Sequence, residues 1–232
     1  MVVYGRNPVR EAIRGPRAVH RVWATSKAAH EPWLTASGLS VAISEADEIE
    51  RRCGSPDHQG ICAEVAPFTY ADPARLLAAG PRLIVALDQI QDPQNLGAIC
   101  RTAECAGAGG VVIPERRSAE VTAAVCKASA GAVEHLPVAQ VRNLADFLGE
   151  AKSVGRWCYG AEAEAEVSYD SVDYGDAAVL VLGAEGRGLR PRVAAGCDLL
   201  VGIPLRGRIE SLNVSAAAAI LIYAMAAAPG HP

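Results

Sequence analysis

The sequence has few aromatic residues, no excess of basic charge and no closely paired cysteines, and each shortage excludes a class of protein. Aromatic residues make up only 5% of the 232 residues, so small side chains favour helices packed closely on a sheet over an aromatic-rich β-sandwich. The net charge of −4 means that any site for a polyanion must be local. The seven cysteines contain no C-x-x-C pair and the five histidines lack ligand spacing, which favours reduced thiols and argues against a metal site.

Apolar runs of the length that a membrane or a signal peptide needs are also missing. The longest run, over 212–228, is interrupted by Asn213 and Ser215 and consists mostly of alanine, so a buried helix is expected there. The opening residues, MVVYGRNPVREAIRG, lack the apolar core of a signal peptide. These features predict a soluble cytoplasmic protein with no membrane partner.

Residues 1–67 differ in character from the rest of the chain and are expected to form a small α/β domain. Its first helix is expected to begin with Asn7 as cap and to end at Gly15. Three prolines follow within 67–82, which indicates a linker over 68–82. The other elements expected in this domain are strands over 18–25 and 61–66 and a short helix that begins at Ser44.

From residue 83 onward, apolar strands alternate with helices. Strands that are apolar almost throughout are buried on both faces, which is typical of a mostly parallel sheet covered by helices on either side. The predicted strands are 83–88, 110–113, 135–141, 157–161, 178–183 and 199–205, and the predicted helices are 95–106, 118–130, 143–154 and 211–227. We therefore expect residues 83–232 to form a second α/β domain.

Basic charge gathers at the start of the chain. Residues 1–27 carry six basic side chains against one acidic one, whereas residues 28–67 carry two against seven. This pattern is typical of a solvated surface, and also of a basic edge that contacts a phosphate backbone, so the sequence leaves both interpretations open. The arginines that recur every three to four positions along the first helix and its exit are Arg6, Arg10, Arg14 and Arg17.

Ligands of open parallel sheets bind where loops leave the carboxyl ends of the strands, and three such loops carry unusual chemistry. The first follows the strand 83–88 and leads into a helix that begins at Asp92. Asn95 at the start of this helix is either a capping amide or a site residue. Arg101 points away from the apolar stripe of the helix, so it is solvated, paired with Glu104, or functional.

The second and third loops are rich in glycine and in basic residues. The second, LVLGAEGRGL over 180–189, lets the backbone approach a ligand closely, but its glycine spacing differs from the dinucleotide-binding G-x-G-x-x-G. Glu185 in this loop would repel a phosphate, which favours a cationic or hydroxyl-bearing ligand. The third loop carries Arg206 and Arg208, and Ser211 is expected to cap the helix that follows. Each of these residues also has a structural interpretation, as a turn, a solvated arginine or a cap.

Together the three loops resemble the ordered motifs of the SpoU/TrmH family of RNA ribose 2′-O-methyltransferases, which have the trefoil-knotted SPOUT fold. The matching stretches are NLGAICRTAECAG (95–107), LVLGAEGRGL (180–189) and IPLRGRIESLNVSAAAA (203–219). The opening VYGRNPVREAI and the later HQGICAEV (58–65) resemble the L30e-like RNA-binding domain of the subgroup that methylates a guanosine of 23S rRNA. The resemblance thus implies a knotted α/β domain preceded by an L30e-like substrate-binding domain.

The resemblance also implies a cofactor, partners and site residues. S-adenosylmethionine would bind in the loops of the knot, RNA would be the substrate, no metal would be needed, and two copies would form a homodimer. The residues so implied are Gly183, Ile203, Leu205 and Leu212 at the cofactor, Asn95, Arg101, Glu185, Ser211 and Asn213 in the catalytic set, and Arg6, Arg10, Arg14, Arg206 and Arg208 on the RNA.

Ribose methylation needs in-line approach of the 2′-oxygen and a destination for its proton. The family gives the latter role to the arginine that matches Arg101, but a guanidinium is effectively always protonated. We therefore expect Arg101 to clamp an RNA phosphate and to polarise the 2′-oxygen, while phosphate or water takes the proton. Asn95 and Glu185 are expected to orient Arg101, and Ser211 and Asn213 to contact the target nucleotide.

Other functions remain open from the sequence alone. A tRNA ribose methyltransferase, or a thiostrepton-resistance type methyltransferase acting on an rRNA adenosine, would use the same chemistry on another RNA. A non-catalytic RNA-binding or ribosome-assembly protein would have lost Arg101, Asn95 or the S-L-N-x-S motif, which are all present. A nucleotide-binding oxidoreductase would need its glycines in a different order.

Overall fold

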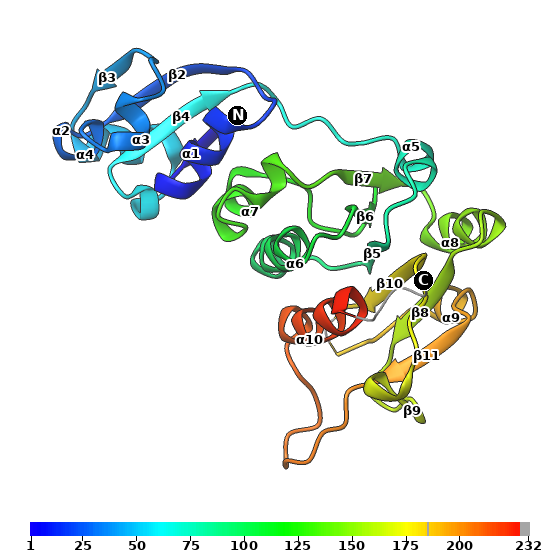
Figure 1. Cartoon of the computed structure of the whole chain (residues 1–232). Coiled ribbons are helices and arrows are strands. Elements are labelled where there is room, and N and C mark those ends of the chain that lie inside the picture. The colour runs from blue at the N-terminus through cyan, green and yellow to red at the C-terminus, as the bar shows by residue number, and fades with distance from the viewer. Residues whose placement is uncertain (185, 228–232) are drawn as a thin grey trace.

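The computed structural model of the chain describes residues 1–184 and 186–227. It contains two sheets, the smaller at the upper left of Figure 1 and the larger from the middle to the lower right, joined by a long connecting segment. The smaller sheet comes first in the chain, in blue and cyan, and the larger follows in green to orange. The α/β class predicted from the sequence is confirmed.

The first sheet has four strands of mixed direction. β1 (Val2–Tyr4) and β2 (Val19–Ala24) both pair antiparallel with β4 (Ile61–Val65), and β2 pairs parallel with β3 (Val41–Ile43). Its helices are α1 (Arg6–Arg14), α2 (Ser26–Ala29), α3 (Pro32–Thr35), α4 (Ala46–Cys53) and the 3-10 turn η1 (Pro56–His58).

The second sheet has seven described strands, and every pairing between them is parallel. Their order is β7-β6-β5-β10-β8-β11-β9. The strands are β5 (Leu83–Asp88), β6 (Gly110–Pro114), β7 (Val138–Val141), β8 (Trp157–Ala161), β9 (Val167–Ser168), β10 (Ala178–Gly183) and β11 (Leu199–Gly202). The helices are α5 (Pro73–Ala78), α6 (Pro93–Cys105), α7 (Ala123–Ala128), α8 (Leu144–Ser153), α9 (Pro191–Ala194) and α10 (Val214–Ala227), with the 3-10 turns η2 (Ala132–Glu134) and η3 (Tyr169–Ser171).

Alternation of side chains along β5 explains how the larger sheet is covered on both faces. Leu83, Val85 and Leu87 belong to the core beneath α6 and α10, whereas Ile84 and Ala86 belong to the core beneath α8. All of these side chains are buried, as the continuous apolar run predicts. The sheet is therefore a buried central layer between two layers of helices (Figure 1).

Several predicted boundaries are wrong, and local contacts explain the differences. The first helix begins at Arg6 with Gly5 as its cap, so Asn7 is not the cap. The helix expected over 118–130 begins only at Ala123, because Ala119 and Val121 donate backbone hydrogen bonds to Ile90 and the Tyr70 hydroxyl and hold the preceding residues outside the helix. The strand expected over 199–205 ends at Gly202, two residues before Pro204, which has no N–H for a ladder.

The expected linker over 68–82 packs onto the second sheet. Ala71 forms a parallel bridge with Ala139 of β7, and α5 inserts Leu76 and Leu77 into the core beneath α8. Where one domain ends and the next begins, at residues 67 and 83, stays a prediction, and so does the threading of the chain through a knot.

Candidate functional site

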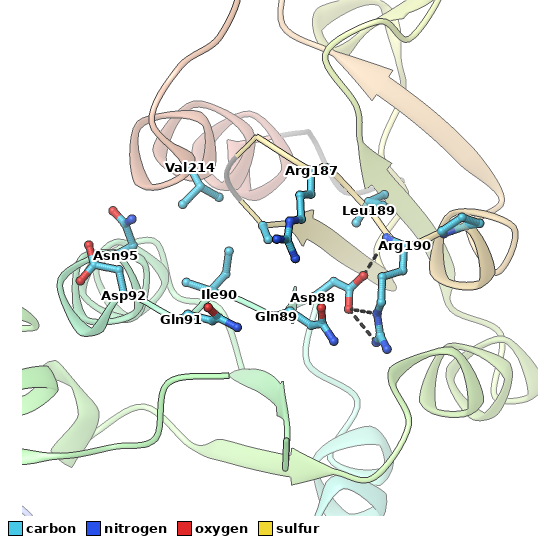
Figure 2. Close-up of a pocket in the computed structure, with 13 residues that line it drawn as sticks. Asp88, Gln89, Ile90, Gln91, Asp92, Asn95, Arg187, Leu189, Arg190 and Val214 are labelled. Carbon is cyan, nitrogen blue, oxygen red and sulfur yellow. Dashed lines mark hydrogen bonds and ion pairs between the residues drawn. The ribbon is translucent and has the colours of Figure 1, made fainter. Parts of the chain in front are cut away.

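A cavity of about 500 Å³ opens where β5 and β10 end side by side (Figure 2). Pairing of the two strands places Gly183 opposite Asp88, so the loops that follow them leave the same edge of the sheet. This is the edge at which the sequence predicted a site. The cavity is lined by residues 88–92 and Asn95 after β5, by Ala184 and residues 187–191 after β10, and by Val214 at the start of α10.

A buried ion pair closes one side of the cavity. Asp88 is fully buried, and its carboxylate accepts hydrogen bonds from the backbone N of Arg190 at 2.9 Å and from the Nε of Arg190 at 2.8 Å, as Figure 2 shows. A second guanidinium nitrogen lies 2.7 Å from the same carboxylate. Because a buried carboxylate is stable only with such partners, this pair fastens the loop after β10 to the end of β5. The sequence motifs do not indicate this pair, although a carboxylate at the end of an apolar strand is a signal for a buried partner.

The glycine-rich loop folds back on itself at the rim of the cavity. A side chain on Gly183 would place its Cβ 2.2 Å from the backbone carbon of Gly188, so only glycine fits this close approach. Gly188, at φ +63°, donates a backbone hydrogen bond of 3.0 Å to Ala184, which closes the turn. Ala184 and Gly188 line the cavity, while Gly183 lies behind them. Glu185 lies outside the described residues.

Two asparagines from distant motifs meet beside the cavity. The Nδ2 of Asn213 donates a hydrogen bond of 3.1 Å to the Oδ1 of Asn95, which is 6% exposed. The Oδ1 of Asn213 in turn accepts the backbone N–H of Ser215 at 2.8 Å. Asn213, and not Ser211, is therefore the cap of α10, because it is held in place by Asn95 as well as by its own helix.

The rest of the third motif lies away from the cavity. Residues 203–213 form a long loop that extends from the second sheet between β11 and α10, at the bottom of Figure 1. Ile203 is half-buried against the core, but Leu205 and Leu212 are about 40% exposed, at 39% and 42%. None of the three lines the cavity, and Ser211 is also exposed on the loop.

Arg101 is exposed on α6 and does not join the asparagines. It lies about 120° around and about 9 Å along the helix from Asn95, so the two side chains leave different faces. Within the described part of the chain, the side chain of Arg101 has no hydrogen bond or ion pair, and the pairing with Glu104 is not formed. The orientation of Arg101 by Asn95 and Glu185 stays a prediction. The neighbouring Cys100 is buried, which raises the pKa of its thiol to about 12, whereas Cys105 is exposed.

The arginines expected to bind RNA are at the surface, and some of them have acidic neighbours. Arg6 forms an ion pair with Glu31, and Arg10 and Arg14 both contact the carboxylate of Glu11. Burial alone would raise the pKa of Glu11, but hydrogen bonds from Arg10 and His135 outweigh it and lower this pKa. Arg206 and Arg208 are exposed on the loop 203–213.

Neither a metal cluster nor a membrane span is found in the described ranges, 1–184 and 186–227. They contain no group of three or more His, Cys, Asp and Glu side chains placed to hold a metal ion. No helix within them combines the length and the apolar character that crossing a membrane requires.

Comparison with known proteins gives two family matches and a set of relatives. Residues 82–223 match the SpoU rRNA Methylase family, and residues 2–71 match the RNA 2′-O ribose methyltransferase substrate binding family. An uncharacterized tRNA/rRNA methyltransferase of Synechocystis is 40% identical over 96% of this chain and 61% of its own length, so the chain spans less than two thirds of that relative. A Bacillus subtilis protein assigned to the TrmH family of tRNA/rRNA methyltransferases is 36% identical over 95% of the chain and 93% of its own length.

Among solved structures, the AdoMet-bound rRNA methyltransferase of Sinorhizobium meliloti superposes with a TM-score of 0.79 and 26% identity. The match covers 97% of this chain and 85% of that one, so it includes both sheets. The family match over 82–223 spans β5, β10 and the start of α10, and therefore every described element that lines the cavity. The chain belongs to the SpoU methyltransferase family, as the order of its three motifs indicates.

Proposed function

We propose that the protein transfers a methyl group from S-adenosylmethionine to a ribose 2′-hydroxyl of RNA. The observation that carries the proposal is the meeting of Asn95 and Asn213, 118 positions apart, beside a cavity at the carboxyl ends of β5 and β10. The family descriptions support it, because one names an rRNA methylase and the other an RNA 2′-O ribose substrate-binding unit.

The cavity suits a cofactor of this size and charge. Its volume of about 500 Å³ falls within the range of small-molecule sites. Backbone groups of residues 187–191 and the polar side chains of Gln89 and Gln91 offer donors and acceptors for adenosine, and Asp92 supplies a negative charge to a cation. When bound, S-adenosylmethionine supplies an electrophilic methyl group on a sulfonium.

The residues of the chain would then position the RNA and neutralise the charge of a phosphate. The guanidinium of Arg101 stays protonated, so it would clamp an RNA phosphate and polarise the 2′-oxygen, while the phosphate or a water molecule takes the proton. Asn213, held by Asn95, and Ser211 would contact the target nucleotide, and Glu185 completes the polar set that the family resemblance implies.

Arg101 lies on another face of α6 than Asn95, so residues of one chain alone do not surround a site that contains both. A second copy of the chain in a homodimer would complete the site. The loop 203–213 carries Leu205, Ile209 and Leu212 with large exposed fractions, of which that of Ile209 is 77%. A second copy packed on this loop would bury these apolar side chains. We propose that, in the dimer, Ile203, Leu205 and Leu212 of this loop contact the cofactor. Gly183 is proposed to contact it as well.

RNA is proposed to run along α1, past Arg6, Arg10 and Arg14, and over Arg206 and Arg208 of the loop. The RNA proposed is rRNA, with a guanosine of 23S rRNA as the target and the cytoplasm as the place of reaction. A tRNA is the second candidate, because relatives such as the Synechocystis protein carry both RNAs in their names.

The test is methyl transfer from labelled S-adenosylmethionine to unmodified total RNA, followed by mapping of alkali-resistant riboses. Arg101→Ala should abolish transfer and leave binding of S-adenosylhomocysteine unchanged. Arg192→Ala, a change at an exposed arginine of α9 that pairs with the exposed Asp146, is the matched control and should keep its activity. Normal transfer by Arg101→Ala would refute the role of this residue, and methylation of a base would refute the ribose as acceptor.

A further inference from the structure

One short segment touches both the first sheet and the helix that carries Arg101. It comprises α7 and the turn η2, residues 123–135, and lies between the two in Figure 1. Val125, Cys126 and Val133 of this segment belong to the same apolar core as Val3 of β1 and Val9 of α1. The proposed RNA-binding unit and the proposed catalytic helix are therefore connected by packed side chains as well as by the chain itself.

A buried ion pair fastens the first unit to this segment. The Nε of Arg17, just after α1, donates a hydrogen bond of 2.8 Å to the Oε2 of Glu134, and the Nη2 of the same guanidinium donates to Oε1. The side chain of Glu134 is 1% exposed and that of Arg17 is 8% exposed. Arg17 also donates to the backbone oxygen of Ala66 at 3.2 Å and lies over the ring of Phe68 at 5.6 Å. Arg17 thus also holds Ala66 and Phe68, where the connection between the two sheets begins.

Weaker contacts surround this pair and fix the orientation of the units. The Nε2 of His135 lies 3.1 Å from the Oε2 of Glu11 in α1. Lys127 of α7 donates to the backbone oxygen of Asp57 at 2.7 Å. Gly131 lies so close to α1 that an added Cβ would be 2.6 Å from the Cβ of Glu11. These contacts and the Arg17–Glu134 pair join the two units at three separate points.

On its other side, the segment packs so closely against α6 that a side chain on Gly97 would not fit. A Cβ on Gly97 would lie 2.4 Å from the Cβ of Ala128 and 2.9 Å from the backbone N of Ser129. Gly97 is one helical turn before Arg101. A displacement of the segment would therefore displace α6 and the guanidinium on it.

We propose that Arg17 and Glu134 are positioning residues, which set where RNA held by the first unit meets Arg101 on α6. This inference rests on the proposed function. The pair does not touch the cavity, so its role is to hold the geometry between the RNA-binding arginines and the reacting ribose. Misplacement of a reacting group by about 1 Å can lower a rate by about 100-fold.

The test separates RNA binding from the chemical step. Glu134→Gln leaves Arg17 buried without its ion pair, so the double variant Arg17→Met/Glu134→Gln, which removes both charges, is made beside it. Glu48→Gln, which breaks the exposed ion pair of Glu48 with Arg52 within α4, is the matched control. Each protein is measured for RNA affinity, for S-adenosylhomocysteine affinity and for single-turnover methyl transfer on the RNA that the wild type modifies.

The expected result is a fall of at least about 10-fold in the single-turnover rate of both variants, with both affinities within about 3-fold of the wild type. Chymotrypsin should also cleave the double variant faster than the wild type after Phe68 and Tyr70, because the connecting segment has lost Arg17. The conservative Glu134→Asp should regain part of the rate, and Glu48→Gln should lose none.

Three other results would count against the positioning role or against the proposed function, and the measurements distinguish the two cases. Unchanged transfer by the double variant would refute the positioning role alone, as would a loss of RNA affinity as large as the loss of rate. A wild-type protein that methylates no RNA would refute the proposed function and this role with it. If Glu134→Gln does not fold, the double variant decides between the outcomes.

Discussion

Replacing Gly97 by alanine tests how closely α6 and α7 are packed. The added Cβ would lie 2.4 Å from the Cβ of Ala128, 2.9 Å from the backbone N of Ser129 and 3.0 Å from the backbone O of Val125. Carbon atoms in contact are ordinarily about 3.5 to 4.0 Å apart. None of the three obstructing atoms can swing aside by a change of rotamer, so one helix must move by about 1 Å.

The expected change in the free energy of unfolding is the difference between two opposing effects. Overpacking of a buried contact costs about 1 to 3 kcal/mol, and the upper end applies here because backbone must shift. Alanine is better than glycine in a helix by about 1 kcal/mol. We therefore expect Gly97→Ala to lower the free energy of unfolding by about 2 kcal/mol. With a urea m-value of about 3 kcal/mol/M, the midpoint should fall by about 0.7 M.

The assay is urea unfolding followed by circular dichroism at one fixed protein concentration. Gly149→Ala in α8 is the matched control, because Gly149 is helical and exposed and an added Cβ would meet nothing within 4 Å. This variant should gain about 0.5 to 1 kcal/mol from helix propensity alone. A Gly97→Ala protein as stable as the wild type would show that α6 and α7 are packed less closely than described.

Three further predictions concern charge and thiols. Arg10→Gln with Arg14→Gln should weaken RNA binding and make the slope of log K against log salt shallower by about 2, whereas an unchanged slope would place the RNA elsewhere. Because the pKa of Glu11 is lower in the folded protein, its stabilising contribution is complete above about pH 5 and is lost as the pH falls. Glu11→Gln should accordingly flatten the acid limb of the stability curve in urea titrations, and a limb of unchanged steepness would contradict this. Iodoacetamide at pH 8 should label the exposed Cys105 before Cys100, whose pKa of about 12 and full burial protect it, and equal labelling rates on mass spectrometry would contradict the packing of α6.

The larger sheet was predictable because its strands carry an unmistakable local signal. The runs 83–87 and 178–182 are apolar throughout and are followed by turn residues, and the predicted strands 83–88 and 178–183 coincide with β5 and β10. Helix α6 was predictable from Asp92 and Pro93, since Asp92 accepts the backbone N–H of Gln94 at 2.9 Å.

The features that the sequence did not predict depend on contacts between residues far apart in the chain. Ser211 and Asn213 are equally good caps by sequence, and the choice is made by the hydrogen bond to Asn95. The pair of Asp88 and Arg190 spans 102 positions, and each residue alone reads as surface charge. Arg101 was placed correctly on the solvent side of its helix, yet the sequence could not tell which other residues share that side.

The wholly parallel sheet has a consequence for how the chain acquires its structure during synthesis. Parallel neighbours cannot be joined by a hairpin, so every pairing waits for a long crossover, and such sheets form slowly. β10 is the strand that links β5 to β8, and it is made 95 residues after β5. Until it emerges, the edge of β5 opposite β6 has no partner, and unpaired strand edges of this kind are prone to aggregation. The four strands of the first sheet are complete by residue 65, so this sheet can form long before the cavity exists.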